Sequence, residues 1–585
     1  MTFSDPHSFV DILQGEIKHI KFNIQVDFEN RLLNIKVRYL MDKSVSGSLF
    51  LDTRDINIHR IYSGENEIIW EKDMQDPILG ERLHLKNLKN CSEFSIELST
   101  SSKASALQWM TAAQTKGGMH PFLYTQCQAI HARSIFPCQD SPSIRFTYEA
   151  EVEVPEPLIA VMGAARLEED GKCQFHMSQP IPSYLFAMAV GNLTFKELGT
   201  RTGIYAEPEL IEAAAWELAG NEEKLNEAEK LLGPYLWDRY DVLIMPPSFP
   251  YGAMENPRLT FFSSGLIVGD RSWDNVVTHE LAHAWTGNLI TNATWEDFWL
   301  NEGWTTYAET RITEVLMGKE FGQLIDTGSY LDLLEDMNRF GLDSEITCLK
   351  YSQKGKDPDE VFSVIPYLKG SYLLKLLERV AGRERIDLFI QKYISTYKFQ
   401  SLTTEAFVTF LGEEFPEEIK EIDLDEWLYQ PGLPKDAPQY QSKLYDELVI
   451  ATENLKNGVL PDQDQIASWI PDQIYYFLVL LPDVISVDHC REIEELFKLK
   501  ESQDYSTIYF FYTCAIQSGY QDIMPYVEKL IGSCGRSYPL GAVFRALVKT
   551  EWSRELARPL FERYCERHHP ISVARVETIL EEAGL

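Results

Sequence analysis

The chain has 585 residues, of which 44% are hydrophobic and 24% are charged. These proportions are those of a folded globular protein and exclude a disordered or fibrous chain, and the length predicts three or four domains. The formal net charge of −35 argues against nucleic acid and anionic membranes as partners, because both would repel the chain. The same charge could attract peptides with basic residues, although maintenance of solubility is the simpler explanation.

Cysteine usage and hydropathy indicate the compartment. Nine cysteines are scattered along the chain and none forms a CxxC pair, which favours free thiols in a reducing environment. The first twenty residues lack a basic segment followed by an apolar one. The longest apolar stretch, residues 474–481, is far short of the roughly 20 residues that span a bilayer. We expect a soluble, cytoplasmic monomer.

Alternation of apolar and polar residues dominates positions 1–193. Residues 19–28 and 143–154 are clear examples, and turn residues separate such segments. A period of two predicts antiparallel β-strands with one buried face. This part of the chain is therefore predicted to be an N-terminal β-domain.

Helical spacing predominates in residues 194–434, and a few strands interrupt it, notably at 241–245 and 258–262. Pro208 is predicted to lie in the first turn of one helix, and Asp274 is a candidate N-cap of another. The region is predicted to form a mixed α/β domain.

Prolines and a glycine gather within residues 427–438, which predicts an exposed linker. We place the linker itself at 435–445. Beyond it, residues 446–585 show only helical patterns, as in 489–499 and 523–531, separated by short polar breaks. Stacked helix pairs of the HEAT or armadillo type are predicted.

The motif His279-Glu280-Leu281-Ala282-His283 predicts a metal site. His279 and His283 are about one helical turn apart, so both imidazoles can bind one ion from the same helix face. Glu280 can accept a proton from water that zinc activates. Glu302, in a second helix-like segment at 298–307, is the expected third ligand, which leaves one position for water and substrate. We predict one zinc ion per chain and a hydrolytic reaction.

Two further glutamates are candidates for this site. Glu255 follows a glycine-containing turn and would place an anion beside the metal, although a loop glutamate is more often a solvated surface residue. Glu309, about two turns after Glu302, could orient a histidine ligand, or could simply be exposed on its helix.

The combination of GAMEN (252–256), HELAH (279–283) and NEGW (301–304) resembles the M1 (gluzincin) metallo-aminopeptidase family. The resemblance narrows to the leukotriene A hydrolase and bifunctional aminopeptidase branch through further motifs: SALQW (105–109), QCQAIHAR (126–133), PPSFPYG (246–252), TGNL (286–289), VIPYLKG (364–370) and WLYQPGLP (427–434). It implies an α+β multidomain protein with an N-terminal antiparallel β-saddle domain, a thermolysin-like zinc domain and an all-α C-terminal domain.

The resemblance also implies residue roles. Glu255 and Gln128 would bind the free α-amine of a peptide, and Tyr367 would donate a hydrogen bond to the developing oxyanion. The substrate-binding positions expected around the amine form two segments: Gln126, Cys127 and Gln128, and Pro250, Tyr251, Gly252, Ala253, Met254 and Glu255.

The sequence departs from the family pattern at two places. Arg536 corresponds to a cation for the peptide's C-terminal carboxylate, but Tyr538 stands where the family has lysine. Asp359 corresponds to the aspartate that positions water in epoxide hydrolysis, while Phe362 replaces a nearby tyrosine.

The predicted function is zinc-dependent removal of the first residue from short peptides with a free N-terminus. Hydrolysis of a leukotriene-A-like lipid epoxide is the alternative reaction. A non-catalytic scaffold is a third reading, but such a protein should have lost a ligand or the base, and here all are present.

Overall fold

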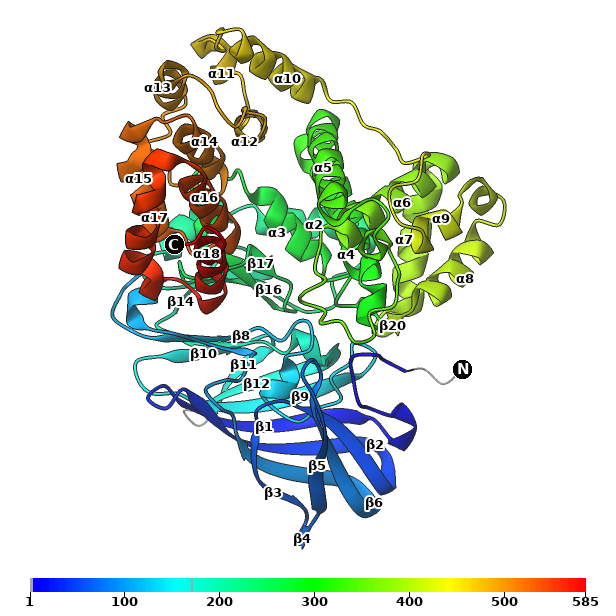
Figure 1. The fold of residues 1–585 in the computed structure, drawn as a ribbon. Coiled ribbons are helices and arrows are strands. Elements are labelled where there is room, and N and C mark those ends of the chain that lie inside the picture. The colour runs from blue at the N-terminus through cyan, green and yellow to red at the C-terminus, as the bar shows by residue number, and fades with distance from the viewer. Residues whose placement is uncertain (1–3, 170–171) are drawn as a thin grey trace.

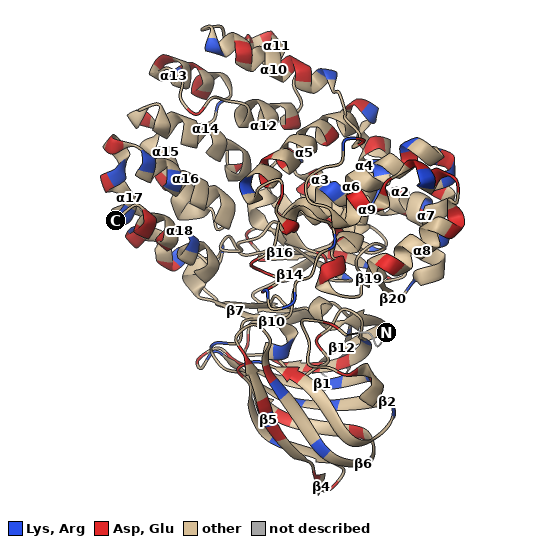
Figure 2. Ribbon diagram, turned by 45° about the vertical axis from the view of Figure 1, so that its right-hand side comes forward, with Lys and Arg blue, Asp and Glu red and all other residues tan. Residues whose placement is uncertain are grey.

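The computed structural model describes residues 4–169 and 172–585 (Figure 1). Sheets formed by the first third of the chain lie below a central mixed region, and the C-terminal helices lie to one side of that region. Acidic and basic residues are distributed over helices of the central and C-terminal parts and over the strands below them (Figure 2). The negative charge is therefore not confined to one element.

The N-terminal part contains a large sheet with the order β11-β12-β9-β1-β2-β6-β3-β4, and β5 also pairs with β6. Its strands are β1 (Ile17–Asp27), β2 (Leu32–Thr53), β3 (Asn57–Ser63), β4 (Asn66–Glu67), β5 (Ile69–Asp76), β6 (Gly80–Ser99), β9 (Arg145–Glu153), β11 (Ala165–Glu169) and β12 (Lys172–Pro182). The prediction of purely antiparallel pairing is wrong at one point, because β1 pairs in parallel with β9, with Ile24 opposite Val152. A period of two fixes which face is buried, but it does not fix strand direction.

A smaller antiparallel sheet lies next in the order β10-β13-β8-β7. It consists of β7 (Leu107–Met110), β8 (Phe122–Thr125), β10 (Ile159–Met162) and β13 (Met188–Gly191). All four residues of β8 are buried. Because β8 ends at Thr125, residues 126–128 follow directly from the C-terminal end of this inner strand.

The central region has a five-stranded sheet, β14-β15-β16-β18-β17, in which β15, β16 and β18 are parallel. The strands are β14 (Thr194–Glu197), β15 (Thr202–Ala206), β16 (Tyr240–Met245), β17 (Ala253–Met254) and β18 (Leu259–Ser263), and a separate parallel pair is β19 (Ile290–Asn292) with β20 (Gln400–Leu402). The helices are α1 (Ile211–Glu217), α2 (Asn221–Leu232), α3 (Asp274–Ala282), α4 (Trp299–Met317), α5 (Lys319–Phe340), α6 (Ile365–Ala381), α7 (Arg383–Tyr397), α8 (Thr404–Glu414) and α9 (Leu424–Tyr429).

Two predicted helix starts are wrong by a few residues. Pro208 lies before α1, which begins at Ile211. Asp274 is the first residue of α3 rather than its cap, and its carboxylate lies 2.7 Å from Lys224 Nζ on α2. An acidic side chain in the first turn interacts favourably with the helix dipole, so aspartate suits both the N-cap and the first helical position.

Beyond residue 442 the chain is helical. The helices are α10 (Lys443–Lys456), α11 (Gln463–Ala467), α12 (Pro471–Val479), α13 (Val487–Leu496), α14 (Tyr505–Gln517), α15 (Met524–Ser533), α16 (Ser537–Lys549), α17 (Glu551–Tyr564) and α18 (Pro570–Glu582). Helices α10, α12, α14, α16 and α18 each pack on the next of this series, and α17 packs on both α15 and α16. This is the predicted stacking of helix pairs.

The predicted linker is only partly correct. Trp427 belongs to α9 and is fully buried, and its Nε1–H donates to Asp436 Oδ1 at 3.1 Å. The prolines and the glycine therefore mark the end of α9, and residues 427–438 are not exposed along their whole length. The apolar residues after 443 form a core of their own, together with Leu324 of α5. The boundaries at 193, 434 and 445 remain predictions.

All nine cysteines are free, and seven are buried. Within residues 4–169 and 172–585, none of the helices combines the length and the apolar character that crossing a bilayer requires.

Candidate active site

Helices α3 and α4 bring three donor atoms together. His279 Nε2 and His283 Nε2 lie 3.1 Å apart, and Glu302 Oε2 lies 3.4 Å and 3.3 Å from them. Four donors arranged tetrahedrally around one zinc ion at about 2.0–2.1 Å lie about 3.3–3.4 Å apart. Glu302 Oε2 is also buried without a hydrogen-bond partner. The donor set therefore fits zinc in both chemistry and spacing.

The other ring nitrogens of the two histidines are also bound. Glu309 Oε2 lies 3.0 Å from His279 Nδ1, which decides between the two readings of Glu309 in favour of an orienting contact. His283 Nδ1 lies 3.0 Å from the carbonyl oxygen of Thr286 and 3.1 Å from Thr305 Oγ1. Such partners hold the proton on each Nδ1, so that each Nε2 is unprotonated and its lone pair can bind a metal ion.

The crossing of α4 and α6 places Tyr367 near this cluster. A Cβ atom on Gly370 would lie 2.9 Å from the Cα atom of Gly303, so the two helices touch through glycines. Tyr367, one turn before Gly370, lies parallel to the His279 ring at 6.1 Å between centroids. Burial, and then the charge of Glu302, raise the pKa of Tyr367 well above its usual value. The phenol therefore stays protonated and can donate.

Two more carboxylates face the histidines. Oxygen atoms of Glu255 and Glu280 and a nitrogen of His283 lie within 4.8 Å of one another. Glu280 Oε2 and Glu255 Oε1 are buried without hydrogen-bond partners. Burial raises the pKa of Glu280 to about 8, and it also raises the pKa of Glu255. These groups are positioned to bind a proton or a cation.

The turn before Glu255 is held from two sides. Ala253 and Met254 form β17 and pair with β18. The backbone carbonyl of Glu255 accepts a hydrogen bond of 2.7 Å from Asn288 Nδ2. Asn288 lies in the TGNL motif directly after the zinc helix, and its role was not evident from the sequence. The motif therefore fixes Glu255 relative to α3.

The other predicted amine-side residues lie nearby. Gln126 Nε2 donates to Met254 Sδ at 3.2 Å, while its Oε1 is buried and unpartnered. Gln128 is half-buried, and the Cys127 side chain is buried, which raises the pKa of its thiol. The structure therefore joins the QCQ and GAMEN segments through Gln126 and Met254, and the binding of a substrate amine by Gln128 and Glu255 stays a prediction.

Arg536 reaches the same turn from the C-terminal helices. Gly535 packs against the 246–252 segment so closely that a Cβ atom would lie 2.0 Å from the carbonyl oxygen of Pro247. The backbone N–H of Ser537 donates to the carbonyl of Pro250 at 3.2 Å. The Arg536 guanidinium donates to Ser506 Oγ and lies 5.9 Å from the Trp273 ring centre. Tyr538 is 53% exposed, with the Arg575 guanidinium 5.4 Å from its ring centre.

Arg536 also lines a cavity of about 530 Å³ where all three parts of the chain meet. Lys116, Lys529 and Arg567 line the same cavity, whereas the three zinc-binding candidates do not. The cavity is therefore a space behind the carboxylate-binding candidate rather than the reaction centre itself.

Asp359 and Phe362 lie on the approach to Tyr367. Phe362 is 57% exposed, and its ring meets the Tyr367 ring edge-on at 5.9 Å. Asp359 is held by His131, with 2.7 Å between Oδ2 and Nε2. Burial, followed by the charge of Asp359, raises the pKa of Tyr251.

A His-Glu-x-x-His helix with a glutamate from the next helix, in a chain that also has an N-terminal β-domain and C-terminal stacked helices, defines a gluzincin-type metallopeptidase. Comparisons with known proteins agree. Residues 17–185 match the Peptidase M1 N-terminal domain, 216–427 the Peptidase family M1 domain, and 469–580 the domain described as leukotriene A4 hydrolase, C-terminal.

Relatives match over nearly the whole chain. Leukotriene A-4 hydrolase of Xenopus laevis is 36% identical, covering 97% of this chain and 98% of the relative. Leucine aminopeptidase 2 of Aspergillus niger is 35% identical, covering 98% and 97%. The structure of yeast LTA4 hydrolase in complex with Bestatin superposes with a TM-score of 0.92 at 30% identity, covering 99% and 97%. The chain therefore belongs to peptidase family M1, in the leukotriene A4 hydrolase branch, and the predicted enzyme class, a zinc aminopeptidase, is confirmed.

Proposed function

We propose that this enzyme removes the N-terminal residue from short peptides, at one zinc ion per chain held by His279, His283 and Glu302. The observation that carries the proposal is the position of Glu255. Among the described residues its buried Oε1 atom has no hydrogen-bond partner, and an oxygen of the carboxylate lies within 4.8 Å of atoms of His283 and Glu280, where it can bind an ammonium group. An amine bound there places the first peptide bond, and no later one, at the metal.

Each residue has a distinct task in this reaction. When bound, a zinc ion supplies Lewis-acid chemistry that activates water and polarises a carbonyl. Glu280 accepts the proton of the attacking water and passes it to the leaving amine. Tyr367 donates its phenolic hydrogen to the oxygen that becomes negative in the transition state. Gln126 and Gln128 offer amide oxygens to the substrate amine beside Glu255.

The far end of the substrate would meet Arg536. A guanidinium can bind a carboxylate through two parallel hydrogen bonds. Because Arg536 lies beside Gly252, a peptide of a few residues would connect Glu255 to it. We further infer that the enzyme is a monomer in the cytoplasm, and its free cysteines support this reducing compartment. The net charge of −35 supports the inference that nucleic acid is not a partner.

The test uses purified protein and tripeptides with a free N-terminus. Release of the first residue should stop on chelation, return with added zinc, and be absent for N-acetylated tripeptides. Glu280→Gln should lower kcat by a factor of at least about 100 while zinc stays bound, because the base is lost but the ligands remain. Unchanged turnover in this variant would refute the mechanism, and equal cleavage of acetylated peptides would refute the exopeptidase assignment.

Epoxide hydrolysis is a second candidate, favoured by the half-exposed Asp359 carboxylate, which lies on the segment whose Phe362 packs on Tyr367. A carboxylate there could orient a water away from the metal. Product analysis with a lipid epoxide decides this reaction: a diol that is absent with Asp359→Asn supports it, while an unchanged product in that variant opposes it.

A further inference from the structure

A segment without helix or strand leads into α6 and carries Asp359. It occupies residues 348–364, and we call it the Asp359 segment. Within residues 354–362 only Pro358 is buried. The end of the segment contacts the active site through the edge-on packing of Phe362 on Tyr367. An exposed segment in this position needs external contacts to keep one conformation.

His131 provides one such contact from the N-terminal β-domain. Its Nε2 lies 2.7 Å from Asp359 Oδ2, and its Nδ1 lies 2.8 Å from Ser105 Oγ. Both nitrogens are satisfied when the serine hydroxyl donates to Nδ1 and Nε2–H donates to the carboxylate. The His131 side chain is 16% exposed and that of Asp359 is 52% exposed. The imidazole is therefore the fixed partner, and the carboxylate is the group that it holds.

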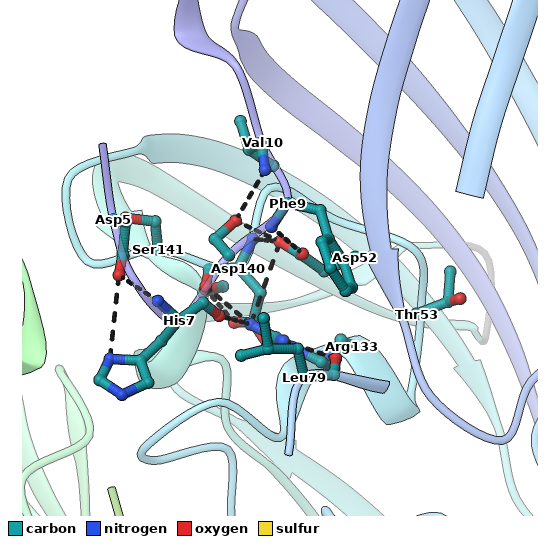
Figure 3. Close-up of polar contacts among 12 residues, drawn as sticks. Asp5, His7, Phe9, Val10, Asp52, Thr53, Leu79, Arg133, Asp140 and Ser141 are labelled. Carbon is teal, nitrogen blue, oxygen red and sulfur yellow. Dashed lines mark hydrogen bonds and ion pairs between the residues drawn. The ribbon is translucent and has the colours of Figure 1, made fainter. Parts of the chain in front are cut away.

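The backbone that carries His131 is firmly anchored. Arg133, two residues later, is fully buried and donates to Asp140 Oδ2 at 2.8 Å, to the carbonyl of Leu79 at 2.8 Å and to the carbonyl of His7 at 2.7 Å. Figure 3 shows these groups gathered around the Arg133 side chain. A buried ion pair with its hydrogen bonds satisfied resists displacement, so His131 is presented from a rigid base.

The same cluster supplies a second contact with the Asp359 segment. His7, drawn beside Asp5 in Figure 3, is 1% exposed. Its Nε2 lies 3.1 Å from the carbonyl oxygen of Lys356, three residues before Asp359. The β-domain therefore binds the segment at two nearby points, one on the backbone and one on a side chain.

We propose that His131 is a positioning residue of the enzyme. By binding Asp359 it fixes the Asp359 segment against the β-domain, and thereby fixes Phe362, whose ring packs edge-on against the ring of Tyr367. The kinetic consequences rest on the proposed aminopeptidase function, whereas the consequences for the segment itself do not.

The first experiment measures the segment and the reaction together. In His131→Ala, amide hydrogens of residues 354–363 should exchange at least about tenfold faster, because the side-chain contact is lost. The kcat/KM for a tripeptide should fall about fivefold or more, in proportion to a lost hydrogen bond to a charged group. His131→Gln should restore both quantities to within about twofold, since its amide offers a donor and an acceptor.

A matched control is available in the same domain. His84 also bridges a serine and an aspartate, with 2.9 Å to Ser48 Oγ and 3.6 Å to Asp73 Oδ2, but both partners belong to the large sheet. His84→Ala should leave exchange in the Asp359 segment and tripeptide turnover unchanged. An equal loss in His84→Ala and His131→Ala would overturn the proposal, because it would reflect damage to the domain as a whole.

A double-mutant cycle tests whether His131 acts through Asp359. The double variant His131→Ala with Asp359→Ala should be no less active than Asp359→Ala alone. Additive losses, unchanged exchange in His131→Ala, or faster exchange with unchanged kcat/KM in an active enzyme would each overturn the proposal. If the wild-type enzyme cleaved no peptide, the proposed function would fail, while the exchange measurement would still decide whether His131 holds the segment.

Discussion

Gly303 on α4 lies so close to Gly370 on α6 that a Cβ atom added to Gly303 would lie 2.8 Å from the Cα atom of Gly370. This contact sets the separation of the helix that carries Glu302 from the helix that carries Tyr367. Neither glycine has an unusual backbone conformation, so both are required for space rather than for flexibility.

Gly370→Ala should therefore damage both stability and activity. Overpacking of a close helix crossing costs about 1–3 kcal/mol. A shift of α6 would also move Tyr367, so we expect kcat to fall about tenfold, the cost of a weakened oxyanion contact. Thermal unfolding and tripeptide kinetics measure the two effects. Gly412→Ala on α8 is the control: among the described residues, nothing beyond its chain neighbours and the nearby backbone of its own helix lies within 4 Å of the added Cβ, and a gain of up to about 1 kcal/mol is expected. Equal behaviour of the two variants would contradict the argument.

Glu309→Gln should weaken zinc binding without removing a ligand. The carboxylate accepts a hydrogen bond from His279 Nδ1 and increases the basicity of the ring, and loss of such partners costs about 10- to 100-fold in metal affinity. Competition with a chelator measures the zinc dissociation constant. Glu314→Gln lies further along α4, where Glu314 pairs with Arg383, and should leave that constant unchanged. An unaltered zinc affinity in Glu309→Gln would show that the contact does not tune the metal.

The zinc donors were predictable because their spacing is local. His279 lies in α3 and His283 is the residue that caps its C-terminal end, and the residue types alone specify the metal chemistry. The role of Glu309 could not be decided from local sequence, because a glutamate that orients a ligand and an exposed one show the same pattern. Only the packing of α3 on α4 decides between the two roles. The closeness of Gly303 and Gly370 is likewise invisible in the sequence, since 67 positions separate them.

Composition was least informative where helices end. The cluster of prolines and glycine after Trp427 suggested an exposed linker, yet Trp427 is buried against the catalytic part of the chain. Turn-forming residues report that a helix stops, but burial depends on what packs over it. Alternation likewise predicted the strands of the first domain but not the parallel pairing of β1 with β9, because strand direction depends on the tertiary arrangement and not on the local pattern.

Asp5→Asn should alter the pH dependence of stability. Burial raises the pKa of Asp5 from 3.8 to about 6, against hydrogen bonds from Ser141 and from the backbone of His7. Between about pH 4 and 6 the unfolded chain loses this proton while the folded chain keeps it, so stability decreases as pH rises through that window. We expect Asp5→Asn to exceed wild type by up to about 3 kcal/mol above pH 6, and to match it below pH 4. Thermal unfolding across this range is the measurement, and a constant difference at all pH values would contradict the assignment.

Arg536→Ala should affect only substrates with a free C-terminal carboxylate. The guanidinium lies beside Gly252, and we propose that a short peptide bound at Glu255 ends there. Loss of a charge-assisted contact of about 1.4 kcal/mol raises KM about tenfold for a free tripeptide, while its C-terminal amide should change less than about twofold. Lys549→Ala, an exposed residue at the end of α16, is the charge-matched control and should alter neither substrate. Because Tyr538 provides no positive charge, Arg536 is expected to account for most of the preference for a carboxylate. If Arg536→Ala raises KM equally for the free tripeptide and for its C-terminal amide, the residue does not recognise the peptide's end. It would instead serve the packing of the C-terminal helices against the substrate turn.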